Sequence, residues 1–242
     1  MCAPLNHKLS PVLSPAVEAI ENAIQDPFCG IYVHWGPFGS GKAVALQDLT
    51  LIMRSKGHVV KYLDAQDTDV LTIENPKFTD WLLSDPGLHF GRFKSFLPSS
   101  KIGPTVIIIN RFDYFMMKPR AKAVIKAVLL SALENQNFKI VLGITRCDDA
   151  LEILKWNGGE KIRIAASAGC GRWGIDDIIA IAAFENRLKR LKDEERAEII
   201  RLGAVSGSPS VFHEMVFTGP NVDLALMSHQ EYAEGIEKLN SI

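Results

Sequence analysis

The chain has 242 residues, of which 47% are hydrophobic, and its formal net charge is −1. This length and composition are enough for one main domain with a buried core and a small appendage. The nearly balanced charge lacks the basic excess that a duplex-binding protein usually carries, so there is no strong nucleic-acid signal.

The beginning of the sequence predicts a helix, a strand and a second helix. Residues 1–13 show no periodic pattern and are expected to form an N-terminal arm. Ser14-Pro15 then places a capping residue before a proline, which is a common start of a helix. Residues 30–35 are β-branched and aromatic and indicate a buried strand. After the next loop, apolar residues recur at helical spacing until Gly57 ends the segment.

The loop between this strand and the second helix is the most informative part of the chain. It reads Gly-Pro-Phe-Gly-Ser-Gly-Lys-Ala and fits the P-loop pattern G-x-x-x-x-G-K-[ST] except at its last position. Backbone N–H groups of such a loop surround a phosphate, and its lysine reaches the terminal phosphates. The last residue lacks the hydroxyl that would bind Mg²⁺. The residues expected to bind a nucleotide are Gly36, Pro37, Phe38, Gly39, Ser40, Gly41, Lys42, Ala43 and Val44.

The remaining elements alternate between strands and helices and then become wholly helical. Strands are expected at residues 58–64, 105–110, 138–145 and 160–166. Helices are expected between them at residues 75–83, 119–135 and 148–156, and residues 87–103 are irregular and rich in aromatic side chains. Four more helices are expected at residues 176–192, 194–202, 209–217 and 222–239.

Alternating strands and helices are typical of a parallel sheet covered by helices on both faces. We therefore predict an α/β fold, a three-layer P-loop NTPase core with about five parallel strands, over residues 14–170. A small all-helical lid is expected over residues 171–242, and the turn at residues 169–171 (Gly-Cys-Gly) is the candidate hinge.

The P-loop, the strands and the helical tail together resemble the AAA+ and related ATPase group of P-loop NTPases. In that group an apolar strand ends in Asp-Glu, and the matching residues 107–113 read Ile-Ile-Ile-Asn-Arg-Phe-Asp. The resemblance places Asn110 at the metal-organising position and Arg111 at the water-activating position. Neither residue fits its role. The amide of Asn110 is neutral and binds a metal ion poorly, and the guanidinium of Arg111 cannot accept a proton from water. Asn110 and Asp113 remain the candidate metal ligands, and Asp113 is also a candidate catalytic group.

The resemblance also implies two sensor positions. Thr145 ends a strand where the group carries a polar residue near the γ-phosphate, and we consider it a candidate catalytic residue; an N-cap of the following helix is the alternative. Residues 207–213 match the start of a lid helix that carries the second sensor, but they contain no arginine. Arg172 lies after the fifth strand and either reaches the phosphates or faces solvent.

The sequence thus predicts an ATP-binding protein with weak or absent hydrolysis, because three altered positions act on one metal-and-water step. It would work as a nucleotide-stabilised switch or interaction module, with a protein partner or a second copy of itself. ATP is favoured over GTP because no Asn-Lys-x-Asp signature occurs, and the role of Mg²⁺ is left open. The alternatives are an active ATPase working in an oligomer and a P-loop small-molecule kinase in which Asp64 or Asp67 binds the acceptor.

Targeting features are absent from the sequence pattern. No stretch approaches the roughly 18 consecutive apolar residues of a membrane helix, and the first residues do not resemble a secretory signal. The four cysteines show neither zinc-finger nor C-x-x-C spacing and are expected to be free thiols. We therefore expect a cytoplasmic protein that does not bind membranes. The same sequence features are compatible with a nuclear location.

Overall fold

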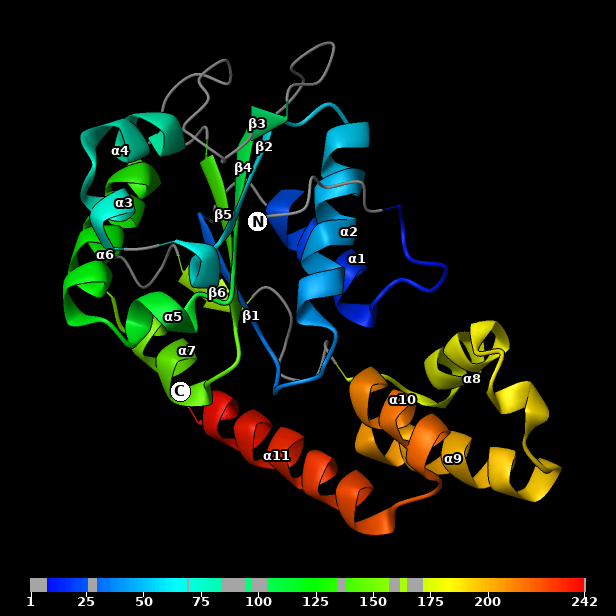
Figure 1. The fold of residues 1–242 in the computed structure, drawn as a ribbon. Helices are drawn as coiled ribbons and strands as arrows, with labels where there is room; N and C mark the ends of the chain where they lie inside the picture. The colour runs from blue at the N-terminus through cyan, green and yellow to red at the C-terminus, as the bar shows by residue number, and fades with distance from the viewer. Residues whose placement is uncertain are drawn as a thin grey trace.

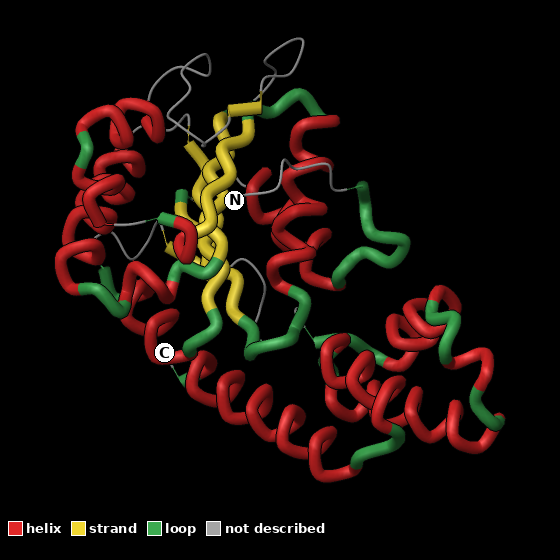
Figure 2. The backbone as a smooth tube through the Cα atoms, viewed as in Figure 1, coloured by secondary structure: helices red, strands yellow, loops and turns green. Residues whose placement is uncertain are grey.

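The computed structural model describes residues 8–25, 30–68, 70–83, 95–96, 104–134, 138–156, 162–164 and 172–241. It contains the predicted three-layer α/β core and a helical lid (Figure 1). Figure 2 shows the strands gathered in one sheet with helices on both sides. The predicted hinge at residues 169–171, and residues 1–7 of the predicted arm, lie outside the described residues.

Six described strands form the sheet, in the order β3-β2-β4-β5-β1-β6. Five of them are mutually parallel, as predicted, and β3 pairs antiparallel with β2 at the edge. The central strands β4 and β5 are buried along their whole length, which requires a continuous apolar sequence. The strands are β1 (Ile31–Trp35), β2 (Val60–Asp64), β3 (Ser95–Phe96), β4 (Thr105–Asn110), β5 (Phe138–Ile144) and β6 (Ile162–Ile164).

The strand register decides which side chains meet at the carboxyl edge of the sheet. The last residues of β1 and β5, Trp35 and Ile144, are paired, and so are the last residues of β2 and β4, Asp64 and Asn110. Ligands of open parallel sheets bind outside this edge. The loops that follow these strands therefore contribute to one common region.

Helices cover both faces of the sheet. Helices α1 and α2 pack on one face, and α3 to α7 lie on the other (Figure 1). The short helices α3 and α5 were not predicted, because four or five residues are too few to show a helical period. The core helices are α1 (Pro15–Gln25), α2 (Lys42–Ser55), α3 (Val70–Glu74), α4 (Pro76–Leu83), α5 (Asp113–Met116), α6 (Pro119–Glu134) and α7 (Cys147–Leu154), and a 3₁₀ turn η1 (Ala65–Asp67) follows β2.

The lid has its own buried cluster, which includes Trp173, Leu202 and Phe212. The single helix predicted at residues 176–192 is wrong: the chain turns extended at Glu185, and Leu188 then packs into the lid cluster. None of the described helices is both long and apolar enough to cross a membrane. The lid elements are α8 (Ile175–Phe184), the 3₁₀ turn η3 (Leu188–Arg190), α9 (Asp193–Ser206), α10 (Pro209–Thr218) and α11 (Val222–Asn240).

Helix α11 connects the lid back to the core (Figure 1). In its first half, Ala225 lies in the lid cluster, whereas Tyr232 and Leu239 in its second half lie in the main cluster of the core. Gly235 passes so close to Trp35 that a Cβ atom there would lie 2.1 Å from the indole ring. Tyr232 meets the same indole edge to face, with ring centroids 6.3 Å apart. One helix thus contributes both to the lid cluster and to the main cluster of the core.

Candidate functional site

The loop after β1 takes a shape that depends on its glycines. Gly39 and Gly41 have φ angles of 80° and 84°, in the left-handed region that favours glycine. A Cβ atom on Gly36 would lie 2.7 Å from the Ser40 hydroxyl oxygen. Helix α2 begins at Lys42, so its first backbone N–H groups are available to an anion beside the loop. This geometry suits a bound phosphate.

Lys42 is buried, and its amine is turned back onto the loop. The Nζ atom donates hydrogen bonds to the backbone oxygens of Gly36 and Pro37, the latter at 2.7 Å, and to the Ser40 hydroxyl at 3.2 Å. Burial lowers the pKa of Lys42 to about 8, although the carboxylates of Asp113 and Glu231 favour its charged form. A phosphate entering the loop would therefore compete with backbone carbonyls for this amine.

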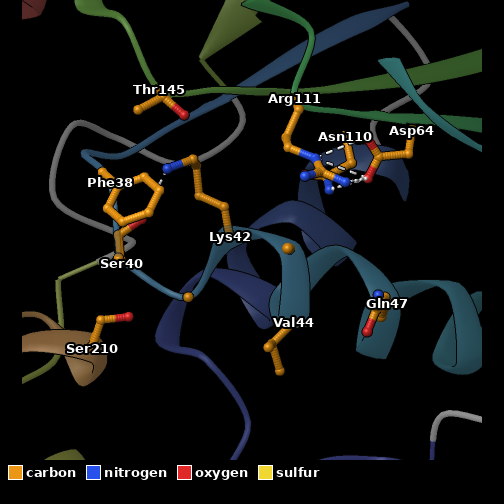
Figure 3. A pocket seen from close by; sticks show the side chains of 13 residues that line it. Phe38, Ser40, Lys42, Val44, Gln47, Asp64, Asn110, Arg111, Thr145 and Ser210 are labelled. Atoms are coloured by element: carbon orange, nitrogen blue, oxygen red, sulfur yellow. Dashed lines mark hydrogen bonds and ion pairs between the residues drawn. The ribbon is translucent and has the colours of Figure 1, made fainter. Parts of the chain in front are cut away.

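A cavity of about 400 Å³ opens in front of the loop (Figure 3). The loop, the start of α2, the ends of β2, β4 and β5 and the start of α10 all contribute to it. Of the predicted site residues, Gly36, Pro37 and Asp113 do not line this cavity. The lining residues are Phe38, Gly39, Ser40, Gly41, Lys42, Ala43, Val44, Gln47, Asp64, Asn110, Arg111, Thr145 and Ser210.

Asp64, Asn110 and Arg111 form a hydrogen-bonded cluster on the wall of this cavity (Figure 3). Arg111 Nε donates to the two Asp64 oxygens at 2.8 and 3.0 Å, and Nη2 donates to Oδ2 at 2.6 Å. Asn110 Nδ2 donates to Asp64 Oδ2 at 2.9 Å. Arg111 Nη1 donates to the side-chain oxygen of Gln66, whose own backbone N–H donates to Asp64 Oδ1 at 3.1 Å. The hydrogen bond to Asp64 raises the pKa of Arg111 above the ordinary value of an arginine, so the guanidinium stays charged.

Asp113 holds the chain after β5 instead of facing the cavity. Its carboxylate oxygens accept hydrogen bonds from the backbone N–H of Thr145 at 3.0 and 2.9 Å and from that of Arg146 at 2.8 Å. Because backbone donors occupy both oxygens, the geometry gives no support to Asp113 as a metal ligand or catalytic group. Thr145 does line the cavity, and the N-cap of α7 is Arg146, so the alternative capping role of Thr145 is wrong.

The lid is hydrogen-bonded directly to the loop. The Ser208 hydroxyl donates to the Gly39 carbonyl at 3.0 Å, and the Ser210 backbone N–H donates to the same oxygen at 3.3 Å. Trp173 Nε1 donates to the Ser40 carbonyl at 3.1 Å. From sequence, residues 207–213 match the start of a lid helix without an arginine, and no pattern predicts a role for Ser208, Ser210 or Trp173.

Arg172 does not line the cavity. Its Nη2 atom donates to the Val205 carbonyl at 3.0 Å and contacts Nδ1 of His229, so the guanidinium stays within the lid. The lid thus presents hydroxyl, amide and indole groups to the loop, and its described residues place no cation in the cavity.

A second, apolar pocket of about 200 Å³ lies between the N-terminal segment, the start of α2 and the lid. Gly41 and Val44 belong to the walls of both cavities, so the two spaces adjoin at the start of α2. The remaining walls of the apolar pocket are Ser10, Pro11, Val12, Trp173, Ile181, Phe184 and Pro209. Its composition suits an apolar group.

Mg²⁺ does not fit the cavity wall. P-loop proteins hold this ion with a Ser or Thr hydroxyl and a carboxylate. Ala43 offers no hydroxyl, and Asp64, the one carboxylate among the described lining residues, is bound by Arg111 and Asn110. A guanidinium so close to that carboxylate would also repel a divalent cation. Throughout the part of the chain that the structure describes, no group of three or more His, Cys, Asp or Glu side chains could hold a metal.

Solved structures share this architecture. Domain III of the replication initiation protein DnaA from Thermotoga maritima is similar, with a TM-score of 0.51 and 12% sequence identity over 95% of this chain and 99% of that domain. A DNA replication initiation factor is similar with a TM-score of 0.50 and 15% identity, over 93% of this chain. The chain has the fold of the AAA+ P-loop ATPases. This confirms the fold expected from the P-loop and the helical tail.

The similarity is structural. No protein-family model and no curated protein sequence matches the chain. The chain also spans only 61% of the length of the replication initiation factor. At identities of 12% and 15%, the shared fold does not by itself transfer an activity to this chain.

Proposed function

We propose that the AAA+ fold of this chain binds ATP between the loop and the lid and hydrolyses it slowly or not at all. One observation carries this proposal: Asp64, the only carboxylate among the described residues that line the cavity beside Lys42 (the Lys42 cavity), is already bound by Arg111 and Asn110. The described lining therefore offers groups that attract phosphate, and it offers no free group that would bind a metal or activate water.

The two adjoining cavities fit the two ends of a nucleotide. The loop amides, the start of α2 and Lys42 suit the phosphates, and the apolar pocket beyond Val44 suits a purine ring. The pocket walls between Trp173 and Phe184 come from the lid, so a bound base would contact core and lid together. ATP is preferred over GTP because the chain lacks the Asn-Lys-x-Asp signature.

Weak hydrolysis follows from the chemistry of phosphoryl transfer, which depends on electrostatics around the metal and on a group that orients water. An active ATPase or a small-molecule kinase would need a carboxylate free to act. Asp64 is held by Arg111, and Asp113 is held by backbone N–H groups. Asp67, the other candidate of the kinase alternative, lies at the end of η1 and does not line the cavity, so neither rival finds support in the geometry. A nucleotide that stabilises one arrangement of lid and core would instead serve as a switch for binding a protein partner or a second copy.

Replacement of Lys42 tests nucleotide binding. Lys42→Ala removes a charge-assisted contact worth about 1.5–3 kcal/mol, so the affinity for ATP should fall at least about tenfold. Isothermal titration calorimetry measures this change, and Lys56→Ala, an exposed lysine just after α2, is the matched control. Equal ATP affinity in parent and Lys42→Ala would show that the loop is only a structural turn.

A phosphate-release assay tests the expected loss of hydrolysis. With saturating ATP and Mg²⁺ the parent should turn over far more slowly than about 1 s⁻¹, the lower end of typical enzyme rates. Turnover at about 1 s⁻¹ or faster would contradict the proposal, even with ATP binding intact.

A further inference from the structure

Arg111 is the second cation on the wall of the Lys42 cavity. Among the described residues of its lining, those with a charge are Lys42, Asp64 and Arg111, and together they carry a net charge of +1. A guanidinium has five N–H groups. Asp64 receives Nε and one N–H of Nη2, and Gln66 receives one N–H of Nη1. No described residue accepts the remaining N–H of either terminal nitrogen, so both can donate to an anion.

The backbone at Arg111 is held in an unusual conformation. Its φ angle of 54° is the only positive φ of a non-glycine residue in the described part of the chain. Such a conformation is costly for a large side chain and tends to persist at functional sites. Here the adjacent residues fix it, because Phe112 donates its N–H to the Gly143 carbonyl at 2.9 Å, while the guanidinium is anchored on buried Asp64. The guanidinium is therefore positioned before any ligand arrives.

The geometry points to Arg111 as an internal replacement for Mg²⁺: anchored by Asp64, its guanidinium binds the terminal phosphates of a metal-free nucleoside triphosphate. This inference rests on the proposed binding of ATP and names the form of ATP that is bound. Arginine presents two N–H groups in one plane, which matches two phosphate oxygens.

The same arrangement selects against the magnesium complex. In an ordinary P-loop site a carboxylate attracts the ion, whereas here the carboxylate of Asp64 is paired with the guanidinium of Arg111. A magnesium ion brought in with the phosphates would be repelled by this guanidinium and would not find the Asp64 carboxylate free. Metal-free ATP carries more negative charge and meets Lys42 and Arg111 directly. ATP should therefore bind at least as tightly in a chelator as in Mg²⁺.

Titration of ATP by calorimetry, in EDTA and in excess Mg²⁺, tests the inference on the full chain. The parent should bind ATP in EDTA with equal or higher affinity than in Mg²⁺. Arg111→Gly removes the guanidinium and suits the positive φ, so the fold should persist, which thermal unfolding checks. Its affinity in EDTA should fall at least about tenfold. Arg120→Ala, an exposed arginine paired with Glu74 on the surface, is the matched control and should leave the affinity unchanged.

A second variant separates the guanidinium from the carboxylate. In Arg111→Gly, Asp64 is released from its cation and can bind Mg²⁺. The ATP affinity of this variant should therefore be several-fold higher in Mg²⁺ than in EDTA. In Arg111→Gly/Asp64→Asn this rescue should disappear, because the carboxylate is gone. Arg111→Lys keeps the charge but loses the planar pair of donors, and its affinity in EDTA should lie between those of the parent and Arg111→Gly.

The outcomes distinguish the two proposals. No ATP binding by the parent in either solution overturns the proposed function itself. Weaker binding by the parent in EDTA than in Mg²⁺, or an Arg111→Gly variant that keeps the parent affinity in EDTA, overturns the role of Arg111 alone. Should Arg111→Gly fail to fold, the comparison of EDTA with Mg²⁺ on the parent decides the question.

Discussion

At the scale of single residues, burial of the Lys42 amine links phosphate binding to pH. The pKa of Lys42 in the free protein is about 8, because burial disfavours the ammonium form. A polyphosphate would bind that form and raise the pKa of Lys42 in the complex. Below about pH 8 the amine is already charged, and above it binding requires the uptake of a proton.

We therefore expect ATP affinity to fall by up to about tenfold per pH unit above pH 8, with proton uptake appearing in the same range. Calorimetry in two buffers of different ionisation enthalpy, from about pH 7 to about pH 9.5, measures both quantities. Lys42→Arg keeps its charge over this whole range and should abolish the slope. An undiminished slope in Lys42→Arg would assign the proton to another group.

His34 in the middle of β1 gives a prediction for stability. Its ring is buried, Nδ1 finds no hydrogen-bond partner among the described residues, and burial together with the charge of Lys42 lowers its pKa to about 3. The unfolded chain takes up this proton near pH 6.5. Between about pH 6.5 and pH 3 the unfolded state therefore binds more protons, and stability falls as the pH falls.

His34→Phe removes this titration and the unpaired ring nitrogen while keeping a planar ring. The free energy of unfolding should decline less between about pH 7 and about pH 4.5 than in the parent, by an amount on the order of 2 kcal/mol. Urea unfolding at several pH values measures the difference. Parallel pH profiles for the two proteins would mean that other groups dominate acid destabilisation.

The residues of the loop could be predicted from sequence because β1, the glycines and α2 follow one another directly. The pair of Asp64 and Arg111 could not, since 47 positions separate them and only the pairing of β2 with β4 brings them together. The chemistry of arginine alone shows that Arg111 cannot act as a general base. No local pattern identifies the carboxylate that Arg111 binds. Ser208 and Trp173 were missed because their contacts depend on how the lid docks.

At the scale of elements, α11 is the helix whose packing is most easily tested. Its Gly235 leaves no room for a larger side chain beside Trp35. The helical pattern of residues 222–239 was visible in the sequence. The contact with Trp35 was not, because nothing in a periodic pattern tells whether a glycine faces another helix or a distant strand.

Gly235→Ala should destabilise the protein by about 1–3 kcal/mol, because the new methyl group overlaps the indole. The effect opposes the roughly 1 kcal/mol by which alanine favours a helix over glycine. Urea unfolding followed by tryptophan fluorescence measures it, and Glu237→Ala on the exposed side of α11 is the matched control. A Gly235→Ala protein as stable as the parent would mean that α11 does not dock on Trp35 in solution.

At the scale of the whole molecule, the described residues connect lid and core at the loop and through α11. Lid groups donate hydrogen bonds to the loop, and α11 contributes to the lid cluster and to the main cluster of the core. The partition into sheet core and helical tail could be predicted from sequence because the strands stop before residue 172. The strength of their connection depends on contacts between residues about 130 to 200 positions apart, which no local pattern reports.

We expect lid and core to unfold in one transition. Bound ATP should raise the midpoint temperature of this single transition. A ligand present at about 100 times its dissociation constant stabilises the native state by about 2.7 kcal/mol. Thermal unfolding followed by near-ultraviolet circular dichroism and by the far-ultraviolet helix signal should give the same midpoint, with and without ATP. A helix signal lost at lower temperature than the aromatic signal would show that the lid melts by itself.

The contact between Gly235 and Trp35 also has a consequence for biosynthesis. A ribosome adds about 5–20 residues per second, so Trp35 is made roughly 10–40 s before the helix that covers it. During this interval the strands can already pair, but the indole and the neighbouring wall of the main cluster stay open to solvent. The nascent chain therefore presents an apolar surface to chaperones until α11 has emerged. The core of the sheet domain is complete only after α11 has been translated and has packed on Trp35.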